Sequence, residues 1–361
     1  MAVPLFDTRT PLQPLLPQLR ERAAAVLEGG TYILGPEVEA FERELAEYLG
    51  VAHVVGVANG TDALTIALRA LGVGEGDEVL VPSFTFYATA EAIPPIGARP
   101  VFCDIDPDTF CVTPDTVRAA LTPRTKAVVA VDLFGNVAPV EEIEALGVPV
   151  LADAAQAAGS TRHGRRAGSF GAAATFSFFP SKNLGGFGDG GAVATNDDGV
   201  AERVRRLRFH GSTDKVTYEE VGYNSRLDEL QAALLRVLLP HLDGWCEGRR
   251  TSARHYAEAG LGELVKLPTP VEEADPAWHL YVIRHPYADR LGPALQRVGI
   301  GQKAYYRTPV HRQPGMRDFA PTWELPGTEE AAATHLAIPM SPVLDRLDAI
   351  QVVSAIREAR S

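Results

Sequence analysis

The run Phe176-Ser177-Phe178-Phe179-Pro180-Ser181-Lys182-Asn183-Leu184-Gly185-Gly186 places a single lysine in an apolar and glycine-rich setting. No other Lys, Arg, Asp or Glu occurs between Arg166 and Asp189. Burial disfavours the charged form of an amine, so a lysine in such a setting can become a nucleophile near neutral pH and form a Schiff base. The alternative is a loop lysine whose stem lies over aromatic rings while its head stays in water. This stretch alone leaves both interpretations open.

Around this run, helical patterns alternate with short apolar runs from about residue 37 to 196, which is typical of a mainly parallel sheet covered by helices on both faces. Amphipathic helices are expected over 37–49 and 61–71. The expected strands cover residues 51–58, 78–81, 99–102, 126–131, 149–152, 174–178 and 192–195. The predicted fold class is therefore α/β. In such sheets ligands bind beyond the carboxyl ends of the strands.

The composition changes in the last third of the chain. A mostly helical stretch over 226–258, interrupted near Pro240 and Gly244, precedes an expected strand at 281–284 and a short helix at 293–298. A loop rich in Pro, His and Arg follows at 308–315. We predict a large domain over residues 1–240, including the N-terminal segment, and a smaller C-terminal α/β domain over 241–361.

Composition and charge exclude several classes of protein. The formal net charge of −12 over 361 residues disfavours binding to nucleic acid or to an anionic membrane. The three cysteines form no zinc-type spacing, so no metal site is predicted. No run is long and apolar enough to span a membrane, and prolines and an aspartate interrupt the N-terminal segment where a secretory signal needs an apolar run. We expect a cytoplasmic protein.

Small and polar residues follow the first predicted strand. The sequence Asn59-Gly60-Thr61-Asp62 opens a helix, and its backbone N–H groups with the Thr61 hydroxyl can hold a phosphate. A plain N-cap role for Thr61 is the alternative. Ser177, on a later strand, can donate to the same phosphate, although a core hydroxyl would look identical in the sequence.

Two further residues suit an aromatic cofactor. Asp153 directly follows the apolar run 148–152, where its carboxylate can keep a pyridine nitrogen protonated. It can equally cap a helix over 154–158. Phe86 can stack on a ring or lie in the core. A phosphate-binding turn, an aromatic ring, a strand-end aspartate and Lys182 together form the set that pyridoxal phosphate (PLP) requires.

One motif is rejected. Residues 186–191 read Gly-Phe-Gly-Asp-Gly-Gly and satisfy the dinucleotide pattern GxGxxG. A genuine fingerprint lies between a strand and a helix, whereas this one precedes the expected strand at 192–195. We therefore predict neither a nicotinamide nor a flavin site.

Several long blocks now support a resemblance to a known family. They read YILGPEVEAFERELAEYLG, VGVANGTDAL, VPSFTFYAT, PVFCDID, ADAAQAAG, FSFFPSKNLGGFGDGGAV, RFHGS and GYNSRLDELQAALL. The chain resembles the DegT/DnrJ/EryC1/StrS sugar aminotransferases, within the fold type I, aspartate-aminotransferase-like superfamily. The resemblance covers nearly the whole length and implies PLP and its pyridoxamine form (PMP) as cofactor.

Carried over by position, the resemblance implies catalytic roles for Lys182, which would hold PLP as an internal aldimine, and for Asp153, the partner of the pyridine nitrogen. It implies a homodimer with two shared sites, because one residue would reach the neighbouring subunit's phosphate. The remaining implied residues are Gly60, Thr61, Ser177 and Asn224 at the phosphate, Phe86 and Gln156 at the ring, and Arg226, Tyr306 and His311 at the substrate.

The activity implied is a ping-pong transamination. An amino donor, L-glutamate by resemblance, would load the cofactor, and a nucleotide-diphospho keto-sugar would then receive the amino group, with Lys182 as acid and base in both halves. The substrate stays open, because Tyr305 and Arg307 replace a histidine and a proline that many members carry there. A keto-cyclitol or aminoglycoside-precursor aminotransferase and a non-catalytic PLP-binding regulator are the alternatives.

Overall fold

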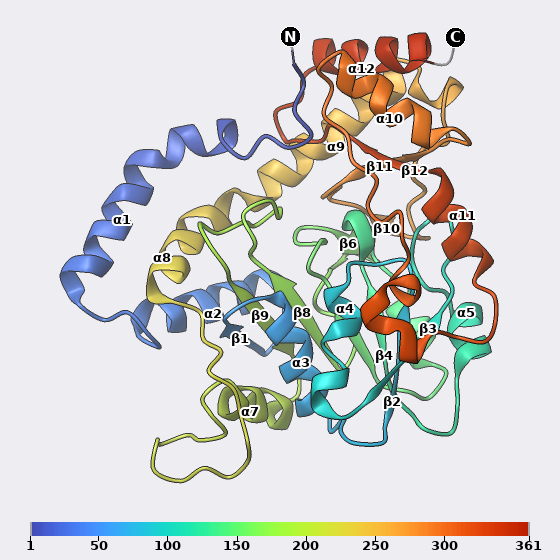
Figure 1. The fold of residues 1–361 in the computed structure, drawn as a ribbon. Coiled ribbons are helices and arrows are strands. Elements are labelled where there is room, and N and C mark those ends of the chain that lie inside the picture. The colour runs from blue at the N-terminus through green and yellow to red at the C-terminus, as the bar shows by residue number, and fades with distance from the viewer. Residues whose placement is uncertain (1, 360–361) are drawn as a thin grey trace.

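A computed structural model describes residues 2–359, and a seven-stranded sheet lies at its centre (Figure 1). The strand order is β1-β9-β8-β5-β4-β2-β3. Only β9 runs antiparallel to its neighbours β1 and β8, and every other pair is parallel. These strands are β1 (His53–Val57), β2 (Glu78–Pro82), β3 (Arg99–Cys103), β4 (Thr125–Val131), β5 (Val150–Asp153), β8 (Ala173–Ser177) and β9 (Gly191–Thr195). The predicted α/β class and mainly parallel sheet are confirmed.

Helices flank this sheet and pack on it through apolar faces. Helix α3 (Gly60–Ala70) lies against β8 and β9 and also contacts α7 (Asp198–Leu207), while α2 (Pro36–Leu49) lies against β1. Shorter helices accompany the other strands: α4 (Ala88–Glu91), α5 (Pro114–Ala120) and α6 (Val140–Glu144). Because both faces of the sheet are covered, its strands are almost wholly buried, which explains their continuous apolar runs.

Local sequence sets the ends of α2 and α3. Gly50 ends α2 in the left-handed conformation at φ 71°, as a glycine C-cap does. The start of α2 depends on a distant residue, because the buried Glu229 carboxylate accepts hydrogen bonds from the N–H groups of Gly35, Glu37 and Val38 at 2.8–2.9 Å. A negative group at a helix N-terminus also suits the helix dipole.

The C-terminal third builds a second apolar core around a two-stranded sheet of β11 (Tyr281–Arg284) and β12 (His335–Ile338). The predicted interruption at Pro240 is confirmed as a 3-10 turn, but the one at Gly244 is wrong, because that residue lies inside α9. The helix expected over 293–298 begins earlier, at Ala288. The division at residue 240 stays a prediction. The helices here are α8 (Glu229–Leu238), α9 (Leu242–Glu258), α10 (Ala288–Arg297), α11 (Pro326–Thr334) and α12 (Arg346–Ala359).

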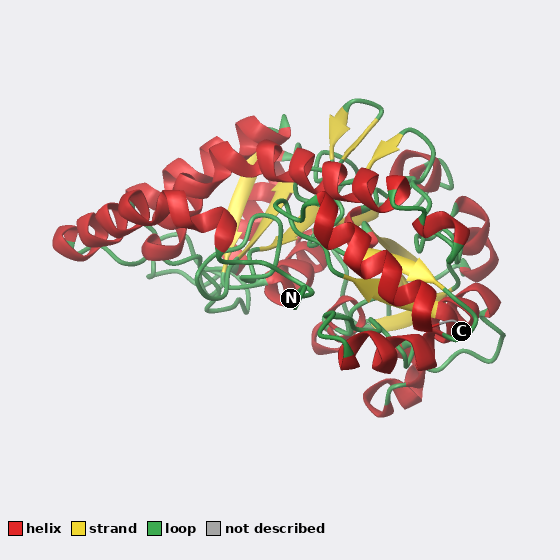
Figure 2. Cartoon of the chain, turned by 90° about the horizontal axis from the view of Figure 1, so that it is seen from above, coloured by secondary structure: helices red, strands yellow, loops and turns green. Residues whose placement is uncertain are grey.

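The remaining elements are short, apart from the N-terminal helix α1 (Leu16–Gly29), which packs on α8. Viewed from above, the helices lie around the sheet, and both termini are marked (Figure 2). The short strands are β6 (Thr161–Arg162), β7 (Arg165–Arg166) and β10 (Ala274–Asp275), and the 3-10 turns are η1 (Thr10–Leu15), η2 (Pro94–Ile96), η3 (Leu133–Gly135), η4 (Leu239–His241), η5 (Leu261–Glu263), η6 (Val310–Arg312) and η7 (Pro314–Phe319).

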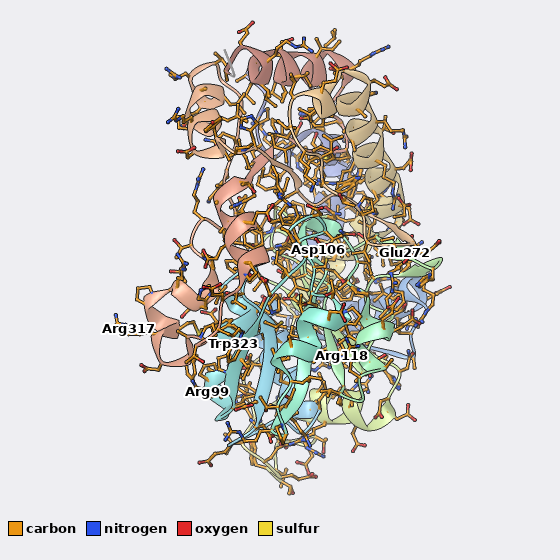
Figure 3. All side chains as sticks on the ribbon, turned by 90° about the vertical axis from the view of Figure 1, so that its right-hand side faces the viewer. Arg99, Asp106, Arg118, Glu272, Arg317 and Trp323 are labelled. Carbon is orange, nitrogen blue, oxygen red and sulfur yellow. The ribbon has the colours of Figure 1, made fainter. Side chains whose placement is uncertain are left out.

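The edge strand β3 is covered by the C-terminal part of the chain. Figure 3 shows Arg99 of β3 on the same side of the molecule as Arg317 and Trp323. The Arg99 guanidinium lies 5.2 Å from the Phe319 ring centre and donates to the Asp318 carbonyl at 2.9 Å. Such cover keeps an edge strand from pairing with other chains. The loop after residue 303 reaches the carboxyl end of β2, since the Val310 N–H donates to the Ser83 carbonyl at 2.9 Å.

Within residues 2–359 none of the helices has the length and apolar character needed for a membrane span. Over the same residues, His, Cys, Asp and Glu side chains do not gather in a group of three or more that could hold a metal ion.

Candidate active site

A cavity of about 700 Å³ opens beyond the carboxyl ends of the central strands. This is the position that a parallel sheet of this kind predicts for its ligand. Eight of the eleven residues singled out in the sequence line it: Gly60, Thr61, Phe86, Asp153, Gln156, Ser177, Lys182 and Tyr306. The fold therefore gathers into one space side chains that are up to 246 positions apart in the chain, as the numbers of Gly60 and Tyr306 give.

Lys182 sits in the turn after β8, where its N–H donates to the Phe179 carbonyl at 2.8 Å. The turn is tight, because a Cβ on Gly185 would lie 2.5 Å from the Pro180 carbonyl oxygen. Burial lowers the pKa of the Lys182 amine from 10.5 to about 8, against an opposing attraction from Asp153. A lysine head held in open water would keep its ordinary pKa, so the alternative of a solvated loop lysine does not fit.

Asp153 ends β5 and is buried beside the cavity. Its carboxylate accepts a hydrogen bond from the Thr89 hydroxyl at 3.0 Å and one from the Ala155 N–H at 3.2 Å. Burial raises its pKa, while these hydrogen bonds and the Lys182 charge lower it. The helix considered over 154–158 does not form, because the chain makes consecutive turns there. Asp153 is thus the last residue of β5, and it lines the cavity.

The turn before α3 forms a cradle. Asn59, not Thr61, is the N-cap, since its side chain accepts from the Asp62 N–H at 2.8 Å. The first helical hydrogen bond starts at the Ala63 N–H, so the N–H groups of Gly60 and Thr61 precede the helical ladder. A Cβ on Gly60 would lie 2.8 Å from the Ser177 Cβ. This close approach brings the Ser177 hydroxyl to the positive end of α3, where an anion binds best.

An aromatic wall and a polar contact lie across the cavity. The Phe86 side chain is 55% exposed, so it is not a core ring, and its centre lies 6.0 Å from that of Tyr306. Gln156 accepts from the Phe134 N–H at 2.8 Å and donates weakly to the Tyr306 hydroxyl at 3.4 Å. Burial raises the pKa of Tyr306, which keeps its hydroxyl protonated.

The other three predicted residues do not line this cavity. Asn224 is exposed and Arg226 is half-buried, both in the segment before α8. The His311 Nδ1 hydrogen-bonds the Ser83 hydroxyl, and its Nε2 lies 3.5 Å from Glu329. Burial lowers the pKa of His311 despite this carboxylate.

Sequence reasoning missed several residues of the cavity wall. Thr89 and His279 both line it, together with Tyr305, which the sequence had marked only as a departure from the family pattern. Thr89 follows Phe86 by three positions, and its N–H donates to the Phe86 carbonyl at 3.1 Å, so both residues belong to one turn of the chain. The one available signal for His279 is its place just before the predicted strand at 281–284.

In the structure too, the glycine motif does not have the position of a dinucleotide fingerprint. Residues 186–191 lead directly into β9 and no helix follows them there. A Cβ on Gly191 would lie 2.4 Å from the Asn59 carbonyl oxygen, so this glycine is required by close packing against the cradle.

The fold is that of a fold type I aminotransferase, and a lysine, a strand-end aspartate and the turn before α3 line one cavity in it. The chain matches the DegT/DnrJ/EryC1/StrS aminotransferase family over residues 17–357 and belongs to that family. The predicted family, fold type and enzyme class are confirmed.

Known relatives span the whole chain. A pleiotropic regulatory protein of Geobacillus stearothermophilus is 44% identical, over 99% of this chain and 98% of the relative. A dTDP-3-amino-3,4,6-trideoxy-alpha-D-glucose transaminase of Streptomyces venezuelae is 43% identical, over 99% of this chain and 96% of the relative. The crystal structure of S. venezuelae DesV in complex with a ketimine intermediate superposes with a TM-score of 0.95 at 42% identity, covering 100% of this chain and 99% of that one.

Proposed function

We propose that this enzyme uses PLP to move an amino group from L-glutamate to the keto carbon of a nucleotide-diphospho sugar. The family and its solved members depend on PLP or PMP, which supports the cofactor. The similar transaminase of S. venezuelae is named for a dTDP-linked amino sugar, which supports the substrate class.

The observation that carries the proposal is the pairing of Lys182 and Asp153 across one cavity. A lysine whose pKa is about 8 is a proton-accepting amine in about half of the molecules at pH 8. A buried carboxylate opposite it gains most from a cationic partner, because burial alone raises its pKa. A ring that carries a protonated nitrogen satisfies Asp153 and leaves the amine free.

The residues present fit the cofactor. When bound, PLP supplies a carbon that carries the amino group and a ring that withdraws electrons from the carbon losing its proton. Gly60, Thr61 and Ser177 would hold its phosphate at the N-terminus of α3. Phe86 would cover one ring face, and Gln156 would lie near the 3-hydroxyl side.

Lys182 would carry the proton in both half-reactions. In the first it takes a proton from the amino acid's α-carbon, and in the second it returns one to the sugar carbon. Burial beside Asp153 keeps its Nζ within the cavity and holds its pKa near the working pH. We assign Tyr306, Arg226 and His311 to the substrate side, where Tyr305 and Arg307 make this chain different from many relatives.

We further propose a homodimer in which Asn224 completes the partner's phosphate site. Asn224 is exposed and lies away from its own chain's cavity, which leaves it available to a second copy. Mixing inactive Lys182→Ala and Asn224→Ala chains tests this arrangement, because a mixed dimer regains one intact site. Activity should return to about a quarter of the wild-type value after subunit exchange. No recovery in demonstrably mixed dimers would rule out shared sites.

The function itself is tested by following the cofactor's absorbance. L-glutamate should convert the bound PLP to PMP, and the correct keto-sugar nucleotide should convert it back. A panel should include dTDP- and UDP-linked 3-keto and 4-keto sugars together with keto-cyclitols, and return of the PLP band only with a cyclitol would favour that alternative. A bound cofactor that no amino donor converts would favour the regulator, the role that the name of the G. stearothermophilus relative suggests. The cytoplasmic location and the lack of nucleic-acid binding stay predictions.

A further inference from the structure

A buried arginine, Arg249, lies behind one wall of the cavity and lines a small neighbouring cavity instead. Arg249 of α9 is 7% exposed, and within the described residues no ion pair joins it to a carboxylate. Its Nη1 donates only to the carbonyls of Trp278 and His279, at 3.1 and 3.4 Å, and its Nε is buried with no hydrogen-bond partner. Burial lowers the pKa of Arg249 to about 10, which still leaves it charged at neutral pH. A buried charge without a counter-ion is costly, so an anion bound nearby would be favoured.

His279 lines the cavity, and Arg249 contacts its backbone carbonyl from behind. His279 is 3% exposed, lines the cavity beside Lys182 and stacks its ring on Phe6 with 6.0 Å between the centres. The charges of Lys182 and Arg249 both act on this imidazole, which places it near each of them.

The backbone around His279 is held by several elements. The Ala277 N–H donates to the Ser160 hydroxyl at 3.0 Å, and the Ala277 carbonyl accepts from the Asn183 amide at 3.3 Å. The Leu280 N–H donates to the Phe134 carbonyl at 3.2 Å. Trp278 has a positive φ of 44°, which is rare for a bulky residue and marks local strain. The imidazole is therefore fixed in place before any ligand arrives.

The protonation state of His279 follows from its surroundings. Burial, then the charges of Lys182 and Arg249, lower its pKa well below 6.5, so the ring is neutral at physiological pH. Nδ1 is enclosed and has no hydrogen-bond partner. Proteins rarely bury an unpaired N–H but tolerate an unpaired acceptor better. We therefore assign the ring proton to Nε2, the nitrogen left to face the cavity.

We propose that the end of the cavity lined by His279 is the subsite for a carboxylate of the amino-acid donor, with the Nε2–H of His279 as the donor group and Arg249 as the charge behind it. The inference rests on the proposed transamination and names the residues that select its first substrate. The same subsite would hold the 2-oxo acid before release. A keto-sugar nucleotide whose sugar carries no carboxylate would make no use of this contact.

Asp7 lines the small neighbouring cavity together with Arg249, but its carboxylate accepts hydrogen bonds from the Arg9 and Thr10 N–H groups at 3.0 and 2.9 Å instead. Asp153 faces Lys182 and is committed to the cofactor side. The other titratable side chains that line the cavity are Asp62, Asp189, Tyr305 and Tyr306. Asp62 belongs to the first turn of α3 and Asp189 to the glycine-rich turn before β9, so both lie on other walls.

The test compares His279→Leu and His279→Asn with wild type. Loss of a hydrogen bond to a carboxylate should raise the KM for L-glutamate about 10-fold to 100-fold in the Leu variant. The kcat/KM of the keto-sugar half-reaction should stay within about threefold. The Asn variant, which keeps an N–H donor, should lie between the two. A readout that needs no turnover is glutarate binding by calorimetry to the full-length protein freed of cofactor, where the Leu variant should lose a similar factor in affinity.

A matched control is His335→Leu. His335 is also fully buried and neutral, with an unpaired Nε2, but it does not line the cavity. Its replacement should lower stability without changing the KM for L-glutamate. An unchanged KM and unchanged glutarate affinity in folded His279→Leu would overturn the inference, as would equal losses in both half-reactions. Should the Leu variant fail to fold, the Asn variant carries the same comparison. Failure of the proposed function would look different, since wild type would then react with no amino donor.

Discussion

Replacing Lys182 by methionine should stabilise the cofactor-free protein at neutral pH. Burial lowers the pKa of this amine from 10.5 to about 8, so below pH 8 the folded chain holds a charge that costs free energy. The difference corresponds to roughly 3 kcal/mol of unfolding free energy, at about 1.4 kcal/mol for each pKa unit. Methionine fills a similar volume without the charge. The expected gain is of this size, because the lowered pKa of Lys182 already includes its attraction to Asp153.

The shifted pKa of Lys182 also determines how the stability difference between wild type and variant changes with pH. Between about pH 8 and pH 10.5 the unfolded chain binds the lysine proton more tightly than the folded chain does, so the stability of wild type rises with pH in this window. The advantage of Lys182→Met should be full below pH 8 and vanish towards pH 10.5.

Urea unfolding at fixed protein concentration measures the free energies of unfolding of wild type and Lys182→Met at pH 7 and at pH 10. Comparing the two proteins at each pH cancels the titration of all other groups. A variant less stable than wild type at pH 7, or a gain that grows with pH, would refute this account of the buried amine.

Two further substitutions test the cofactor site. Gly60→Ala places a Cβ against Ser177 and should weaken cofactor binding at least tenfold in equilibrium dialysis. The control Gly244→Ala, in open space on α9, should leave cofactor binding unchanged and stabilise the fold by about 0.5–1 kcal/mol. Equal cofactor affinity in both variants would contradict the assignment of the turn before α3 to the cofactor's phosphate. Asp153→Asn should keep the cofactor but lower kcat of the L-glutamate half-reaction roughly 10-fold to 100-fold, because the amide cannot hold a proton on the ring nitrogen; unchanged stopped-flow rates would show that Asp153 has another role.

The sheet was predictable because burial of both faces leaves uninterrupted apolar runs, and these mark each central strand to within a few residues. The same logic placed Asp153 at the cavity, because it directly follows an apolar run, whereas Ser177 was predicted from its position on a strand. The predicted helix interruption at Gly244 is wrong because an exposed glycine destabilises a helix by only about 1 kcal/mol, which the packing of α9 offsets.

Other features depend on contacts between distant parts of the chain. The start of α2 needs the carboxylate of Glu229, almost 200 residues further on, and no local pattern announces it. His279 reaches the cavity because Ser160, Asn183 and Arg249 hold its backbone. Thr61 was considered as an N-cap, yet the neighbouring Asn59 takes that position. Local sequence therefore locates the ends of strands well, but it does not show which distant loop packs beside them.

Reductive trapping tests the central claim most directly. Borohydride treatment of the PLP-loaded protein, followed by peptide mapping, should place the label on Lys182, which lines the cavity. The other lysines of the chain, Lys126, Lys215, Lys266 and Lys303, should remain unlabelled. A label on any of those four, or a bound cofactor that borohydride fixes to no residue, would contradict the assignment of Lys182.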